Sequence, residues 1–145
     1  MYGNLSDTQL VKQGIAPQAV AAGATVQGGG IDCLGYETQQ VVVEMGAIVS
    51  GANKTVTVKL QESSDNNVAD AWADVASATT GAIANAGQNE PYIVDVNLSE
   101  VERYLQAVAT GGSSDGGLVS ATFVLAKGRE APPTQVNTVV RIGYS

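Results

Sequence analysis

The side chains best suited to catalysis are scarce in this chain. It has 145 residues and no histidine, which removes the commonest general base, the Ser-His-Asp and Cys-His arrangements and most transition-metal sites. Cys33 is the one cysteine, and a thiol without a histidine partner is a weak nucleophile, so we interpret it as a small buried apolar residue. The triplet Gly28-Gly29-Gly30 lacks the lysine and the following helix of a phosphate-binding loop.

Two pairs of carboxylates have a spacing that could support acid–base chemistry, Asp70 with Asp74 and Glu100 with Glu102. All four lie in stretches typical of turns or capping sites, and that is the simpler interpretation. The run 65–67, Asp-Asn-Asn, could offer oxygen ligands to calcium, but the EF-hand spacing is absent and these are standard turn residues. The sequence therefore predicts no enzyme, no catalytic residue, no metal site and no cofactor.

The charge balance argues against a further class of partner. The formal net charge is −7, from 14 acidic and 7 basic residues, and the basic residues form no cluster. Such a chain repels phosphates, so we expect no nucleic-acid partner. The first residues are polar, and the apolar stretches are too short to span a bilayer, so we expect a soluble protein made in the cytoplasm, with no membrane partner.

The elements that would position these side chains are predicted to be β-strands. Aromatic residues make up only 5% of the chain, 17 residues are glycine, and small and β-branched residues dominate, which suits thin sheets and tight turns. Residues 55–63 show the clearest pattern, because Val56, Val58 and Leu60 alternate with polar residues at a period of two. Turn-forming residues follow at 63–67.

Comparable patterns predict a series of short strands. They cover residues 25–36 (two strands around the glycine triplet), 39–49, 55–63, a short strand from 72, 92–98, 103–110, 118–127 and 137–144, with a loop over 79–90. The regular spacing of turns predicts an all-β fold, either an antiparallel β-sandwich or a jelly roll, and the sequence does not separate these two.

The predicted organisation has four parts. Residues 1–24 form an N-terminal arm or a loosely attached first strand, because Gly14 and Pro17 interrupt any regular pattern. Residues 25–127 form the β-sandwich core. Residues 128–136 form a linker, since consecutive prolines cannot join a strand ladder, and residues 137–145 form a C-terminal strand.

Function in such a chain is expected at surfaces that meet other molecules. Trp72, the one tryptophan, begins a strand after a turn and is interpreted as a core or subunit-interface residue, with a sugar platform as the alternative. The candidate interface residues lie in the arm, at this tryptophan, in the linker and in the last strand: Leu10, Val11, Ile15, Pro17, Trp72, Pro132, Pro133, Ile142 and Tyr144.

Several segments resemble a family of phage proteins. They are Thr25–Asp32 followed by Leu34–Glu37, Val56–Ser63 with the Asp-rich turn and Trp72–Val75, and Arg103–Val108. Together they cover roughly residues 25–127 and are similar to head structural proteins of tailed bacteriophages, the capsid decoration or cement proteins. The final strand departs from the family pattern, because Arg141–Tyr144 follows the Pro132-Pro133 linker.

The resemblance implies a structural virion protein that binds the outer surface of a phage capsid and braces it. It implies the major capsid protein as partner, a homo-oligomer (a trimer favoured) and a location on the outside of the virion after synthesis in the host cytoplasm. The acidic charge agrees with an outer surface. Two alternatives stay open at this point: a carbohydrate-binding β-sandwich module, and another virion component such as a tail or head-completion protein.

Overall fold

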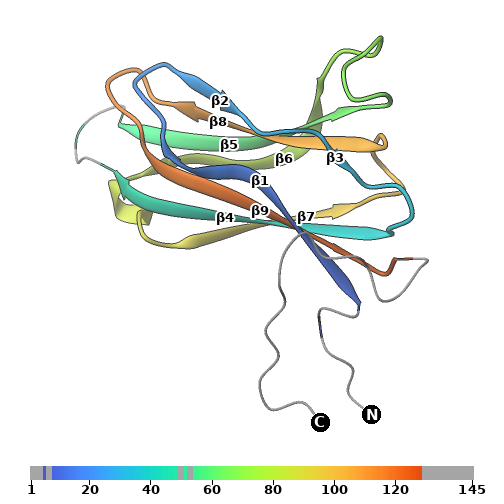
Figure 1. Ribbon diagram of the computed structural model, residues 1–145. Helices are drawn as coiled ribbons and strands as arrows, with labels where there is room; N and C mark the ends of the chain where they lie inside the picture. Colours follow the sequence, from blue (N-terminus) through green and yellow to red (C-terminus); the bar gives the residue numbers. More distant parts are fainter. Residues whose placement is uncertain (1–4, 6–7, 49–50, 52–53, 129–145) are drawn as a thin grey trace.

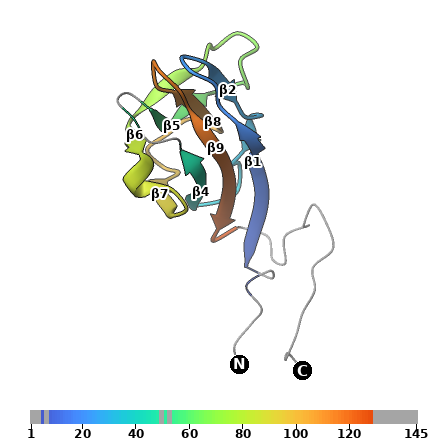
Figure 2. The same cartoon turned by 90° about the vertical axis from the view of Figure 1, so that its left-hand side faces the viewer.

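The chain folds into two antiparallel β-sheets that pack face to face (Figures 1 and 2). The computed structural model describes residues 5, 8–48, 51 and 54–128, and within them there are nine strands and one short 3₁₀ turn. The elements are β1 (Gln9–Ala19), β2 (Thr25–Gln27), β3 (Ile31–Asp32), β4 (Thr38–Ile48), β5 (Thr55–Ser63), β6 (Ala73–Ala84), η2 (Asn85–Gly87), β7 (Pro91–Asn97), β8 (Tyr104–Gly111) and β9 (Gly117–Ala126). The predicted all-β sandwich is confirmed.

The strand order identifies the sandwich as a jelly roll. The first sheet has the order β1-β9-β4-β7, and the second has the order β2-β8-β5-β6, with β3 following β2 along the edge of β8. The antiparallel pairs are therefore nested: β1 with β9, β2 and β3 with β8, β4 with β7, and β5 with β6. A long hairpin folded over on itself gives this nesting, and it is the topology of a jelly roll.

The core lies between the two sheets and follows from the period-two patterns. In β5, Val56, Val58 and Leu60 point inward with exposures of 1% or less, as their alternation predicts. From the opposite sheet, Phe123 and Leu125 of β9 are fully buried. Within the described residues no helix has the length and apolar character needed to cross a membrane.

Of the two interpretations of segment 1–24, a first strand is correct for residues 9–19 and an arm is wrong there. These residues form β1, which pairs with β9 along its length and places Ile15 in the core at 1% exposure. The ladder has two irregularities, between Gln13 and Ile15 and between Ile15 and Gln18. A β-bulge breaks the alternation of buried and exposed residues, so a strand that contains bulges has no clean period in its sequence.

Two further expectations are corrected at β6 and at the glycine triplet. The predicted loop over 79–90 is strand as far as Ala84, and the positive φ of Ser77 (63°) and Gly81 (69°) disturbs the pattern there. The triplet does not turn the chain back, because β2 and β3 continue along the same partner strand, β8. The predicted linker 128–136 beyond residue 128 and the predicted strand 137–145 lie outside the described residues.

Candidate interaction surfaces

The carboxylates considered for acid–base chemistry are bound to different neighbours. Asp74 accepts hydrogen bonds from Lys59 Nζ at 2.7 Å and from Gln61 Nε2 at 2.8 Å, on the outer face of the second sheet. These bonds, led by the one from Lys59, hold the pKa of Asp74 below its usual value. Asp70 instead accepts from the amide of Ser64 at 2.7 Å. The described residues contain no group of three or more histidine, cysteine or carboxylate side chains placed to hold a metal ion.

Cys33 is buried at one end of the core. Its thiol donates to Gln39 Oε1 at 3.1 Å, and desolvation, followed by the nearby charge of Asp32, raises its pKa to about 12. The thiol is therefore protonated at physiological pH, as a packed apolar residue would be. The amide nitrogen of Gln39 has no hydrogen-bond partner within the described part of the chain.

The loop that joins β5 to β6 is the most elaborate feature of the surface, and it projects from one end of the sandwich (Figure 1). Ser63, at the end of β5, is fully buried, and its hydroxyl donates to the carbonyl of Asp70 at 2.8 Å and accepts from the amide of Asn67 at 2.9 Å. Asn66 and Asn67 both adopt positive φ, which asparagine tolerates better than most residues. The turn residues seen in the sequence are thus used to build an ordered loop.

Asp65 completes this loop by accepting bonds from the backbone. Its carboxylate receives the amides of Val68 at 3.0 Å, Ala69 at 2.7 Å and Asp70 at 3.2 Å. Desolvation acts to raise the pKa of Asp65, but the hydrogen bonds from Ala69, Asp70 and Val68 outweigh it and leave the pKa below its ordinary value. These amides occupy the oxygens that the calcium interpretation would need.

The tip of the loop presents an apolar side chain to solvent. Val68 is 85% exposed, although the backbone around it is fixed by Asp65. Trp72, at the base of the loop, is half-buried, and its ring lies so close to Gly30 that a Cβ there would be 3.2 Å from Cη2. Trp72 therefore packs the loop against the chain between β2 and β3 and is not an open aromatic platform.

The same end of the sandwich carries a bidentate ion pair. Arg103 donates from Nε to Asp32 at 2.9 Å and from Nη2 at 2.6 Å, and its guanidinium lies 4.9 Å from the centre of the Tyr104 ring. The hydrogen bond from Arg103 is the main cause that lowers the pKa of Asp32. Both partners are close to half exposed, so the pair fixes the connection from β7 to β8 more than it stabilises the core.

The structure separates the candidate interface residues into three groups. Leu10 and Ile15 are buried in the core, so they cannot meet a partner while the sandwich is folded, which corrects their assignment. Val11 is 43% exposed, Trp72 is half-buried and Pro17 is exposed. The remaining four, Pro132, Pro133, Ile142 and Tyr144, lie outside the described residues.

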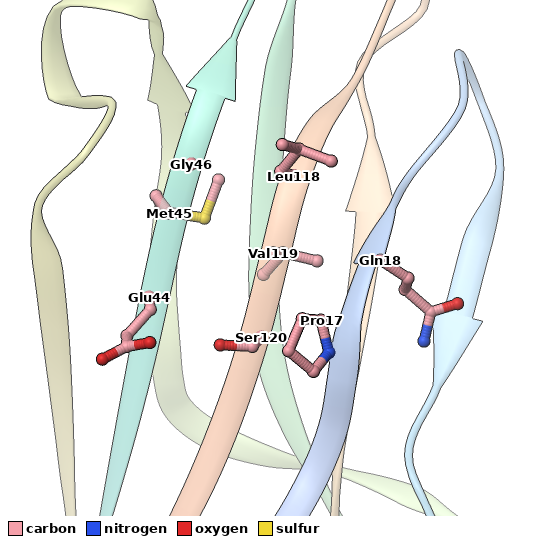
Figure 3. Close-up of a pocket in the computed structure, with 8 residues that line it drawn as sticks. All are labelled: Pro17, Gln18, Glu44, Met45, Gly46, Leu118, Val119 and Ser120. Atoms are coloured by element: carbon pink, nitrogen blue, oxygen red, sulfur yellow. The ribbon is translucent and has the colours of Figure 1, made fainter.

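Pro17 lies beside a shallow hollow on the outer face of the first sheet (Figure 3). The hollow has a volume of about 360 Å³ and includes Gly46 of β4, which packs so closely against Leu118 of β9 that a Cβ at position 46 would lie 2.8 Å from the Leu118 Cβ. Leu118 is 50% exposed there. This hollow cannot be predicted from the sequence, because its lining comes from three strands that are distant along the chain.

A second depression runs between the free sides of β6 and β7, where the two sheets meet without pairing. Its volume is about 440 Å³. Its apolar lining comes from Val75, Ala76, Ala78, Val94, Val96 and Val101, and its acidic lining from Glu62, Asp95 and Glu100. We call this depression the β6–β7 groove.

Comparison with known proteins identifies relatives by fold and not by sequence. No family model matches the chain, and no curated protein matches it. Among solved structures, PBSX exported protein XepA superposes with a TM-score of 0.60 and 17% sequence identity over 100% of this chain. The chain spans 46% of the length of that protein.

A second solved structure, SPBc2 prophage-derived protein YomS, superposes with a TM-score of 0.50 and 10% identity. It matches 82% of this chain and 93% of its own length. At these identities the likeness establishes a shared fold, and the jelly roll described above is a fold that these two phage-encoded proteins share with this chain.

Proposed function

We propose that this chain is a structural protein of a tailed-phage virion, which binds the outer surface of the capsid and stabilises it as a decoration or cement protein. The observation that carries the proposal is the loop 63–72, an ordered projection that presents Val68 to a partner. An apolar side chain on a preorganised backbone gains burial on binding without a large cost in ordering the loop. The fold shared with two phage-encoded proteins supports the phage setting.

In this proposal the chain works by binding and has no catalytic step. Each copy makes a modest contact with the major capsid protein, and many copies on a symmetric shell act together through high local concentration. The net charge of −7 suits a position outside the shell, away from packaged DNA. A homotrimer would place three copies of the loop on one side of the assembly.

The test uses capsids of the encoding phage that lack this protein. Purified chain is added, the particles are sedimented, and bound protein is quantified together with the temperature at which the particles release DNA. We expect saturable binding and a higher release temperature. Val68→Asp should weaken binding at least about tenfold, since it would bring a charge into an apolar contact. The matched control is Ala22→Asp, an exposed residue in the β1–β2 connection.

Binding of the Val68→Asp variant at the wild-type level would exclude the loop as the contact, and no binding of wild type would exclude the cement role.

The second candidate is another phage-encoded component. It is favoured by the two proteins of similar fold, which are an exported protein and a prophage-derived protein and are not named as capsid proteins. Binding in a glycan array that free sugar competes away would instead indicate a carbohydrate-binding module.

A further inference from the structure

The edge of β7 has the most regular register of the sheet edges in the described part of the chain, and its one proline, Pro91, stands at the first position of the strand. The β1 edge has two register irregularities and Pro17. β6 has two irregularities against β5, and β2 and β3 are only three and two residues long. β7 runs for seven residues in one unbroken register against β4. Proteins usually protect edges with bulges, proline or short strands, and an unprotected edge is a pairing site.

The backbone groups that β7 offers can be identified from its partner strand. The amide of Met45 donates to the carbonyl of Glu90, and the amide of Leu98 donates to the carbonyl of Glu37. Hydrogen-bonded and non-bonded pairs alternate in antiparallel ladders, so residues 92, 94 and 96 turn their backbone groups toward β4. Residues 91, 93, 95 and 97 therefore turn theirs outward, and no described strand pairs with them.

The groove beside this edge defines the chemistry of its occupant. Val75, Val94 and Val101 supply an apolar lining, while Glu62, Asp95 and Glu100 supply the charge. No lysine or arginine lines the groove within the described residues. A matching strand would turn apolar side chains toward the groove and carry a positive charge on its other face.

We propose that the β6–β7 groove and the β7 edge receive residues 137–145 of a neighbouring copy of this chain. In that segment Val140, Ile142 and Tyr144 alternate with other residues, and Arg141 is its one charged side chain. Residues opposite one another in an antiparallel pair share a face of the sheet. With Arg141 on the outer face near Asp95, the three apolar side chains turn toward the groove.

The linker is long enough to reach a neighbouring copy. Ala126 at the end of β9 lies opposite Thr38, and Thr38 lies opposite Asn97 at the end of β7. The two strand ends are thus two strand spacings apart, about 10 Å. Residues 129–136 can reach about 25 Å when extended, which is enough to pass this distance and arrive at the β7 of a neighbouring copy. Exchange of a terminal strand is a low-cost route to closed oligomers.

The first experiment measures association in the absence of any capsid, so its outcome is independent of the cement proposal. Full chain and a variant ending at residue 136 are compared by native mass spectrometry, with circular dichroism as the check of folding. We expect the full chain to be an oligomer and the shortened chain to be a folded monomer. Equal oligomer size for both chains would overturn the proposal.

The second experiment identifies the contact by cysteine cross-linking. Copies with Asp95→Cys are mixed with copies with Arg141→Cys and oxidised, and we expect a disulfide-linked pair on a non-reducing gel. The matched control replaces Asp95→Cys with Thr110→Cys, on the other sheet, and should give no such pair. A link that forms only within single chains carrying both cysteines would overturn exchange between copies.

Charge exchange gives a third measurement with the same full-length protein. Arg141→Glu should weaken association by about tenfold, because its carboxylate would face that of Asp95 on the outer face. The combination of Asp95→Lys with Arg141→Glu should restore it. If Arg141→Glu does not weaken association and the double variant does not strengthen it, Asp95 and Arg141 do not contact one another between copies.

Discussion

Asp65 fixes the projecting loop through the three backbone amides that its carboxylate accepts. Because these bonds favour the ionised form, the pKa of Asp65 lies below its ordinary value of 3.8. Its stabilising effect on the loop is therefore complete above that value and is lost as the pH falls through the lower pKa of the folded state. A loop built in this way keeps its shape at neutral pH and loosens in acid.

We expect Asp65→Asn to remove the pH dependence of the loop's stability. The neutral side chain of asparagine accepts these hydrogen bonds more weakly than a carboxylate does. The backbone amides of Val68, Ala69 and Asp70 should therefore exchange hydrogen faster at pH 7 in the variant. The loss of protection that the wild type shows below about pH 4 should also be smaller in the variant. Hydrogen exchange followed by NMR measures both effects. Glu44→Gln, an exposed residue on β4, is the control, and equal exchange in the two variants would contradict the role of Asp65.

Two glycines make a matched pair for testing how tightly the sandwich packs. A Cβ at Gly14 on β1 would overlap the ring of Phe123, which is fully buried, whereas a Cβ at Gly29 would meet nothing within 4 Å. We expect Gly14→Ala to lower the free energy of unfolding by about 1–3 kcal/mol, as overpacking does, and Gly29→Ala to leave it nearly unchanged. Urea unfolding gives both values. An equal effect at the two sites would mean that β1 does not pack on Phe123.

Val58 tests the assignment of the inner face of β5. It is 1% exposed, so Val58→Asp would place an unpaired carboxylate in the core. The expected loss is several kcal/mol, a large part of the roughly 5–15 kcal/mol that holds a domain folded, and the variant should be unfolded at 37 °C. Thr57→Asp, one residue away on the outer face, should fold. A near-native melting temperature for Val58→Asp, read by circular dichroism, would contradict the assignment.

At the scale of elements, β1 is a structural edge strand, and truncation should show it. Removing residues 1–8 leaves the described β1 intact, while removing residues 1–18 deletes nearly the whole strand and uncovers Ala121 and Phe123. We expect the shorter truncation to melt close to the full-length chain and the longer one to be unfolded or aggregated, because β9 would become an exposed apolar edge. A folded chain without residues 1–18 would make β1 an accessory arm after all.

How much of the fold can be predicted depends on the regularity of each strand. The strand predicted at 55–63 agrees with the observed β5, since its alternation is unbroken. β1 and β6 are different, because bulges and the positive φ of Ser77 and Gly81 break the period that a sequence would show. The candidate surfaces are harder to predict from the sequence than the strands are. The loop 63–72 was visible as turn residues, but the groove and the hollow depend on which strands become neighbours.

At the scale of the whole molecule, the nested strand pairing brings the first and last described strands of the chain together in one sheet. β1 pairs only with β9 among the described strands, and β2 and β3 pair only with β8. Most pairings therefore join residues far apart in the sequence, and folds of this kind form in milliseconds to seconds and not in microseconds. The pair of β1 and β9 completes the first sheet. A substitution that disrupts either strand is therefore expected to destabilise the whole of that sheet.

This nesting has a consequence for synthesis on the ribosome. β1 emerges first, yet its partner β9 emerges roughly 100 residues later, a wait of about 5–20 s at ordinary elongation rates. A nascent or prematurely terminated chain cannot complete the first sheet and leaves its apolar face open to chaperones and proteases. Only copies translated through residue 126 can close the first sheet, so the topology itself excludes chains that end before β9 is complete.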